Sequence, residues 1–279
     1  MKNKQKAVLS LAVSLIFTAT AAALFYFTFC NIFYRTDGKN PPINPGESTV
    51  QNGKSASLML CNMFSDNTNI KEHILFGKSI YADGDSVSAG DGSDHYAYAE
   101  FIRDRNNMRL VNRSKGGTTL ALRDDRSDSI YERIRELDGE YDYLLIEGGY
   151  NDVFRGLSLG SPTHSRSSED FDLHTIYGAT DEICRILQTK YADTKKLFVL
   201  GHKMKDEYEI PQQNAWNAIK ETLNKWGIPY IDIYEETGLT SEEYDREYQV
   251  FNQDDGIHPT KKAYEKFYVP VIEEKLKSL

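Results

Sequence analysis

The sequence predicts an α/β domain in which helices cover both faces of a parallel sheet. Two observations favour this fold. Short apolar segments alternate regularly with helix-length amphipathic segments from Lys78 onward, and that rhythm requires right-handed crossovers between parallel strands. In addition, 279 residues with 40% apolar and 27% charged side chains suffice for one good-sized core without the composition of a disordered chain.

The elements follow in order from Lys78. The predicted strands are Ser79–Ala82, Met108–Asn112, Tyr143–Ile146, Lys196–Leu200 and Pro229–Ile233. The predicted helices are Tyr96–Arg105, Ile130–Leu137, Ile176–Thr189, Gln212–Trp226 and Thr260–Leu276. Within the fourth helix, Trp216, Ile219, Leu223 and Trp226 recur at helical spacing, which predicts a buried stripe. The segment 56–77 is ambiguous between short strands and packing segments.

The N-terminus predicts a membrane anchor. Lys2, Lys4 and Lys6 precede an uncharged stretch, residues 7–34. Its most apolar part, about 24 residues, spans roughly 36 Å as a helix, against about 30 Å of hydrocarbon. A cleavable signal peptide is the alternative, but aromatic residues continue after the small-residue run and favour an uncleaved signal anchor. We therefore expect a cytoplasmic tail (1–6), a transmembrane anchor (7–34), a Pro- and Gly-containing linker (35–56) and an extracytoplasmic hydrolase domain (57–279).

Charge narrows the class of partner. Residues 1–35 contain four basic and no acidic side chains, which leaves 29 basic and 42 acidic residues for the rest, a net charge of −13. Such a domain repels phosphate backbones, so nucleic acid is excluded as a partner and an anionic lipid surface is disfavoured. Neutral or weakly charged substrates fit better.

Metal and redox chemistry find no support in the sequence. The histidines outside the carboxyl-terminal loop show no paired ligand spacing, and the chain has no Cys-x-x-Cys, so we expect neither a metal nor another cofactor. Cys61 and Cys184 could form a disulfide in an oxidising compartment or remain buried thiols, and the sequence leaves both open.

Three short stretches carry the parts of a serine esterase site: Gly84-Asp85-Ser86, Gly149-Tyr150-Asn151-Asp152 and Asp255-Gly256-Ile257-His258. Ser86 needs a base to become a nucleophile, and His258 is the candidate. Asp255 lies three residues earlier and can orient the imidazole, while Pro259 can begin the last helix at its first position. Each stretch alone is a common turn, but the combination is not.

Acyl transfer also needs donors directed at the developing oxyanion. The backbone N–H of Ser86, a glycine N–H and the side-chain amide of Asn151 can supply three. Gly117 follows the second predicted strand and is the candidate glycine, with Gly116 as the alternative. Because ligands collect at the carboxyl ends of parallel strands, we expect these residues to converge there.

These blocks resemble the SGNH hydrolases, also called the GDSL esterase/lipase family, over roughly residues 78–278. The resemblance implies a three-layer α/β/α sandwich with a flavodoxin-like sheet of about five strands. It implies that Ser86 is the nucleophile, that Gly117 and Asn151 complete the oxyanion hole, that His258 is the base and that Asp255 orients it. Val87 stands where the family name implies leucine. The α/β-hydrolases are less similar, because Ser88 replaces the second glycine of their Gly-x-Ser-x-Gly elbow.

The function expected from this set is an esterase that removes a short acyl group, such as acetyl, from a carbohydrate or cell-envelope glycan. A lysophospholipase or short-chain lipase, a glycan acyltransferase and a non-enzymatic glycan-binding module are the alternatives. The segment from Val153 to His174 leaves directly from the Asn151 turn and is either a specificity loop or a disordered surface insertion.

Overall fold

The computed structural model describes residues 74–242 and 256–279, which all belong to one compact unit of the chain. The expected tail, anchor and linker, residues 1–56, lie outside these residues, as do Cys61 and Asp255. In the part that is described, no helix is both long enough and apolar enough to cross a membrane.

The centre of the fold is a five-stranded sheet in the order β2-β1-β3-β4-β5, with every neighbouring pair parallel. The strands are β1 (Ser79–Asp83), β2 (Arg109–Asn112), β3 (Tyr143–Glu147), β4 (Lys195–Leu200) and β5 (Tyr230–Asp232). All residues of β1 and β3 are buried, as expected for strands covered on both faces. The predicted parallel sheet is therefore confirmed.

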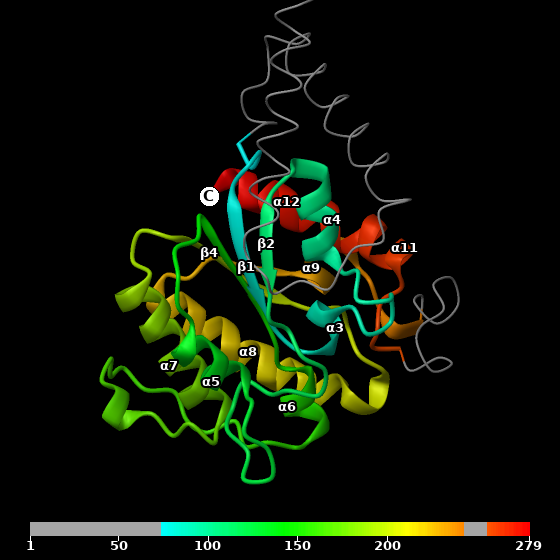
Figure 1. The fold of residues 1–279 in the computed structure, drawn as a ribbon. Helices are drawn as coiled ribbons and strands as arrows, with labels where there is room; N and C mark the ends of the chain where they lie inside the picture. Colours follow the sequence, from blue (N-terminus) through cyan, green and yellow to red (C-terminus); the bar gives the residue numbers. More distant parts are fainter. Residues whose placement is uncertain (1–73, 243–255) are drawn as a thin grey trace, which may run out of the picture. The chain divides into compact units, whose positions relative to one another are not determined.

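Helices form the two outer layers (Figure 1). One layer packs together α5 (Ile130–Glu136), α6 (Tyr150–Phe154), α7 (Ile176–Lys190) and α8 (Glu209–Trp226). The other contains α4 (Tyr98–Asn106), α9 (Ile233–Thr237), α11 (Lys261–Ala263), the π-helical turn η4 (Tyr264–Tyr268) and α12 (Val269–Ser278). Three further short elements are α3 (Ser86–Ala89), η2 (Ser168–Asp170) and η3 (Asp206–Tyr208). The α/β/α arrangement expected from the sequence is confirmed.

The register of the central strands sets the position of the site. Ala82 of β1 pairs with Asn112 of β2 and Leu145 of β3, so the three strands end at nearly the same level. The segments that follow them, which carry Ser86, Gly117 and Asn151, therefore start from one edge of the sheet. The buried stripe of α8 is also confirmed, since Trp216, Ile219, Leu223 and Trp226 are all buried.

The final helix differs from the prediction. It was expected to run unbroken from Thr260 to Leu276, but a π-helical turn separates α11 from α12. Pro270, in the first turn of α12, has no N–H to donate to the carbonyl four residues earlier, which explains the wider turn. The expectation that Pro259 begins this helix is wrong, because Thr260 is the N-cap and its hydroxyl accepts from the Ala263 N–H.

The segment after α6 is ordered rather than a disordered insertion. Arg166 lies over the Trp226 ring, 4.7 Å from its centroid, and donates to the Lys225 carbonyl. Trp226 ends α8 and leads to the amino end of β5, so this part of the segment reaches the edge of the sheet opposite to Ser86. Cys184 of α7 is a fully buried free thiol.

Candidate active site

Ser86 is the first residue of α3, directly after the turn that follows β1. The Asp85 side chain caps this helix by accepting from the Val87 N–H at 2.9 Å. The turn requires Gly84, because a Cβ there would lie 2.5 Å from Ser88 Oγ and 2.8 Å from Glu147 Oε2. Ser86 is thus fixed at the carboxyl edge of the sheet by a short capped helix.

His258 reaches Ser86 from the other end of the chain. Its Nε2 lies 2.7 Å from Ser86 Oγ, a hydrogen-bond distance. The loop at Gly92 packs against it so closely that a Cβ at Gly92 would lie 2.7 Å from the His258 carbonyl oxygen. The structure therefore brings together the serine and histidine that the sequence singled out. Asp255 lies outside the described residues, and its orienting role stays a prediction.

Asn151 is the second residue of α6, not part of a turn as expected. Its Nδ2 donates to the Thr118 carbonyl at 2.9 Å and to Asp85 Oδ2 at 3.3 Å. The side chain thus connects the loop after β2 with the helix cap beside Ser86. Its role in an oxyanion hole stays a prediction, since the amide here donates to protein acceptors.

Backbone donors lie beside the nucleophile. Among residues 74–242 and 256–279, no acceptor bonds to the N–H groups of Ser86, Gly116 or Gly117. A Cβ at Gly116 would lie 3.6 Å from Ser86 Cβ, whereas a Cβ at Gly117 would meet Arg126 Nη1 at 2.8 Å. Gly117 has φ +74°, a left-handed conformation that favours glycine. Both glycines remain candidates for the oxyanion donor.

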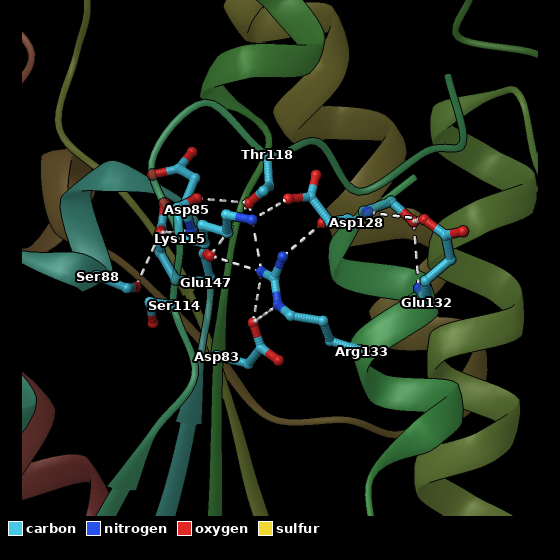
Figure 2. A network of polar contacts seen from close by, with 12 residues as sticks. Asp83, Asp85, Ser88, Ser114, Lys115, Thr118, Asp128, Glu132, Arg133 and Glu147 are labelled. Atoms are coloured by element: carbon cyan, nitrogen blue, oxygen red, sulfur yellow. Dashed lines mark hydrogen bonds and ion pairs between the residues drawn. The ribbon is translucent and has the colours of Figure 1, made fainter. Parts of the chain in front are cut away.

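Two side chains that the sequence did not single out hold this loop in place. Asp152 is fully buried and accepts from the N–H groups of Leu120 at 2.9 Å and Ala121 at 3.1 Å. Arg133 donates to the Gly84 carbonyl and to Thr118 Oγ1, and thus joins the Ser86 turn to the same loop (Figure 2). The neighbouring Asn151-Asp152 pair was the available signal for Asp152.

His202 is a third residue with a role that the sequence did not indicate. It is fully buried, directly beyond β4. Its Nε2 lies 3.0 Å from the Gly256 carbonyl oxygen, and its Nδ1 lies 2.7 Å from the Tyr268 hydroxyl. Since Gly256 is two residues before His258, His202 supports the loop that presents His258 to Ser86.

Several acids at the site are buried without a cation. Burial raises the pKa of Asp85 to about 6 and that of Asp152 to about 7, although backbone N–H donors oppose both shifts. Burial and the nearby Asp85 charge raise the pKa of Glu147 well above its ordinary value. Within the described part of the chain, no group of histidine, cysteine and acidic side chains is arranged to hold a metal ion.

Comparison with known proteins places this geometry in a family. Residues 82–266 match the model of the GDSL-like lipase/acylhydrolase family. The chain belongs to this family. Membership makes the protein a serine ester hydrolase, and it removes the non-enzymatic binding module from the alternatives. No curated protein sequence matches the chain.

Solved structures share the family fold. A protein from Lactobacillus plantarum is 24% identical, with a TM-score of 0.60 over 74% of this chain and 97% of that one. A candidate GDSL-like lipase from Bacteroides ovatus ATCC 8483 is 20% identical, with a TM-score of 0.56 over 73% and 99%. An aryl esterase of M. smegmatis is 15% identical, with a TM-score of 0.52 over 73% and 100%. These likenesses support the fold of the GDSL-like domain.

Proposed function

We propose that this GDSL-like hydrolase removes a short acyl group, such as acetyl, from a carbohydrate or cell-envelope glycan. Ser86 is the nucleophile, His258 the general base and Asp255 the residue that orients His258. The N–H of Ser86, that of Gly117 or Gly116, and the amide of Asn151 stabilise the oxyanion. The 2.7 Å contact between His258 Nε2 and Ser86 Oγ is the observation that carries the reaction type.

The chemistry follows from that contact. His258 Nε2 accepts the Ser86 hydroxyl proton as Oγ attacks the acyl carbonyl carbon, and the carbonyl oxygen becomes an oxyanion beside the open N–H groups. The oxyanion collapses, the bond to the sugar oxygen breaks, and the imidazolium gives its proton to that oxygen, which leaves as a hydroxyl group. Water then attacks the Ser86 ester by the same route and releases the carboxylic acid. Asn151 contributes once the Nδ2 hydrogen that bonds to the Thr118 carbonyl turns to the oxyanion, while the bond to Asp85 holds the amide in place.

The surroundings of Ser86 support a polar substrate. A cavity of about 350 Å³ lies beside Gly116 and Asp91, which border Ser86. Apart from Ala89 and Gly116, its lining is polar or charged: Asp91, His95, Glu100, Asn112, Ser114 and Lys115. Small-molecule sites usually have volumes of about 300–1,000 Å³ and mainly apolar walls. The polar groups of these side chains can bond to sugar hydroxyls, which favours a polar substrate.

The location of the enzyme is part of the proposal. The uncharged stretch 7–34 would anchor the protein, and the linker 35–56 would hold the hydrolase domain outside the cytoplasm, near cell-envelope glycans. The net charge of −13 beyond residue 35 supports a neutral substrate over an anionic surface or nucleic acid. Protease treatment of intact cells tests this orientation, since a cytoplasmic domain would be protected.

A substrate panel tests the function. The full-length protein and its Ser86→Ala variant are assayed with p-nitrophenyl acetate, p-nitrophenyl octanoate, acetylated xylo- and chito-oligosaccharides, and lysophosphatidylcholine. We expect release of acetate from a glycan at the highest kcat/KM, with Ser86→Ala lower by several orders of magnitude. Preference for lysophosphatidylcholine would contradict the glycan assignment and favour the lysophospholipase. Acetyl transfer to an added sugar in place of water would favour the acyltransferase.

A further inference from the structure

A buried acid lies directly beneath the turn that carries Ser86. Glu147 ends β3, the central strand, and its side chain is fully buried. Its Oε2 accepts from Ser88 Oγ at 2.8 Å and from the Asp85 N–H at 3.3 Å, and Figure 2 shows it next to both residues. Its Oε1 has no hydrogen-bond partner in the described part of the chain. A buried carboxylate oxygen without a partner is costly, so the ionised form is disfavoured.

No cation compensates the two carboxyl groups. Among the described residues, no lysine or arginine forms an ion pair with Asp85 or Glu147, and Arg133, which bonds to the Gly84 carbonyl, pairs with Asp83. Two adjacent buried carboxyl groups cannot both ionise, so they share one proton. Burial raises the pKa of Glu147 well above its ordinary value and that of Asp85 only to about 6. Since Glu147 also has the oxygen without a partner, the shared proton belongs on Glu147.

The Asp85 carboxylate contacts both the helix that begins with Ser86 and the side chain of Asn151. One oxygen accepts from the Val87 N–H at the start of α3, and the other accepts from Asn151 Nδ2. We propose that Glu147 is a positioning residue, a neutral acid that accepts from the Asp85 N–H and the Ser88 hydroxyl and thereby fixes the turn that holds Ser86 and Asn151 relative to each other. This inference rests on the proposed roles of those two residues and goes beyond them, because it assigns a protonated acid that does not touch the substrate.

The other titratable groups around this pair behave differently. Tyr98 of α4, Tyr150 of α6 and Tyr268 of η4 face it, and burial raises the pKa of all three, so they stay neutral. His258, Asp91 and Asp152 are the remaining charged or titratable neighbours. Because these ionisable groups surround the pair, the acid side of an activity profile does not report on Glu147 alone. The pH dependence of unfolding above pH 7 reports on Glu147 more specifically.

The test compares Glu147→Gln and Glu147→Met in the full-length protein, with the exposed Glu136→Gln as the control. Glutamine keeps a neutral acceptor for the Asp85 N–H and the Ser88 hydroxyl, so kcat on p-nitrophenyl acetate should stay within about threefold of the wild type. Methionine fills the space without such an acceptor, and we expect kcat to fall about 10- to 100-fold with little change in KM. If Glu147→Met does not fold, Glu147→Asp replaces it, since the shorter acid cannot reach Asp85 and should show the same loss.

Denaturant unfolding between pH 7 and 9 tests whether Glu147 is protonated in the folded protein. A group with a raised folded pKa binds a proton in the folded state that the unfolded chain has released, so stability falls as pH rises toward that folded pKa. The unfolding constant of the wild type should therefore rise up to about tenfold per pH unit relative to Glu147→Gln. Glu136→Gln should keep the wild-type slope.

Two results would overturn the inference. Wild-type kcat in Glu147→Met, or in Glu147→Asp where that variant is used, would mean that Glu147 only fills space. Equal pH slopes for the wild type and Glu147→Gln would mean that Glu147 carries no proton in this range. Neither result touches the Ser86 mechanism, which fails separately if Ser86→Ala retains activity.

Discussion

Asp83 and Asp85 stand on either side of Gly84, and both are fully buried, yet their partners differ. Asp83 Oδ1 accepts from Arg133 Nη2 at 2.6 Å and Nε at 2.9 Å, and Asp83 Oδ2 accepts from the Tyr81 hydroxyl at 2.7 Å. The Asp85 carboxylate accepts from a backbone N–H and from Asn151, and its own N–H donates to the buried acid Glu147. One turn thus contains a charge-paired aspartate and a cation-free one.

The two aspartates therefore have different roles: Asp83 supports the backbone of the turn, and Asp85 contacts the catalytic residues. Arg133 opposes the effect of burial on the Asp83 pKa and also joins the turn to the Gly116–Thr118 loop, so this side of the turn maintains the backbone. Asp85, with a pKa near 6 and direct contact to the catalytic elements, responds to protons at physiological pH. Perturbed acids without cations gather at functional sites for this reason.

Removing the cation should have the largest effect. Arg133→Met leaves Asp83 buried and unpaired, and breaking such a pair costs about 3–5 kcal/mol of unfolding free energy. Urea unfolding at pH 7 measures this loss. The matched control, Arg135→Met, removes an exposed guanidinium from the same helix and should change stability by less than about 1 kcal/mol. Equal losses in the two variants would show that Asp83 does not depend on Arg133.

Neutralising the other aspartate should affect rate more than stability. In Asp85→Asn the side chain still caps α3, but it no longer offers a charged acceptor to Asn151. We expect kcat to fall about 100-fold, which is about 2.7 kcal/mol in activation free energy. Steady-state kinetics on p-nitrophenyl acetate measure it, with exposed Asp94→Asn as the control. A loss of stability with unchanged kcat would mean that Asp85, like Asp83, only supports the backbone of the turn.

Asp152 extends the comparison to a third buried acid without a cation. Its pKa is raised to about 7, so its folded form holds a proton that the unfolded chain loses above its ordinary pKa. Its stabilising contribution is therefore complete below about pH 4 and disappears as pH rises to about 7. Between pH 5 and 7, wild-type stability should fall by about 2 kcal/mol relative to Asp152→Asn. Parallel stability curves would contradict the raised pKa.

Much of the fold follows from local pattern. The spacing of apolar residues in the sequence shows which faces of a strand or helix are covered. For this reason the buried run Tyr143–Ile146 and the buried stripe through Trp216 could be predicted. The meeting of Ser86 and His258 was predictable because Ser86 follows a strand and His258 lies in the last loop before a helix, two positions that converge at the carboxyl edge of a parallel sheet.

The buried acids were not predictable in the same way. A carboxyl group such as Glu147 has the same sequence signature in solvent and in a core, and its pKa depends on neighbours far away in the chain. His202 was likewise interpreted as an isolated histidine, since Gly256 lies 54 residues away from it. The break at η4 was missed because Pro270 acts within an otherwise continuous apolar pattern.

The central claim is that Ser86, activated by His258, is the nucleophile of this ester hydrolase. Reaction of the full-length protein with a fluorophosphonate, followed by peptide mass spectrometry, tests it most directly. We predict one covalent phosphonyl adduct on the peptide containing Ser86, no adduct in Ser86→Ala, and much slower labelling in His258→Ala. An adduct on another serine with Ser86 unmodified, or equal labelling rates in the wild type and His258→Ala, would contradict the account.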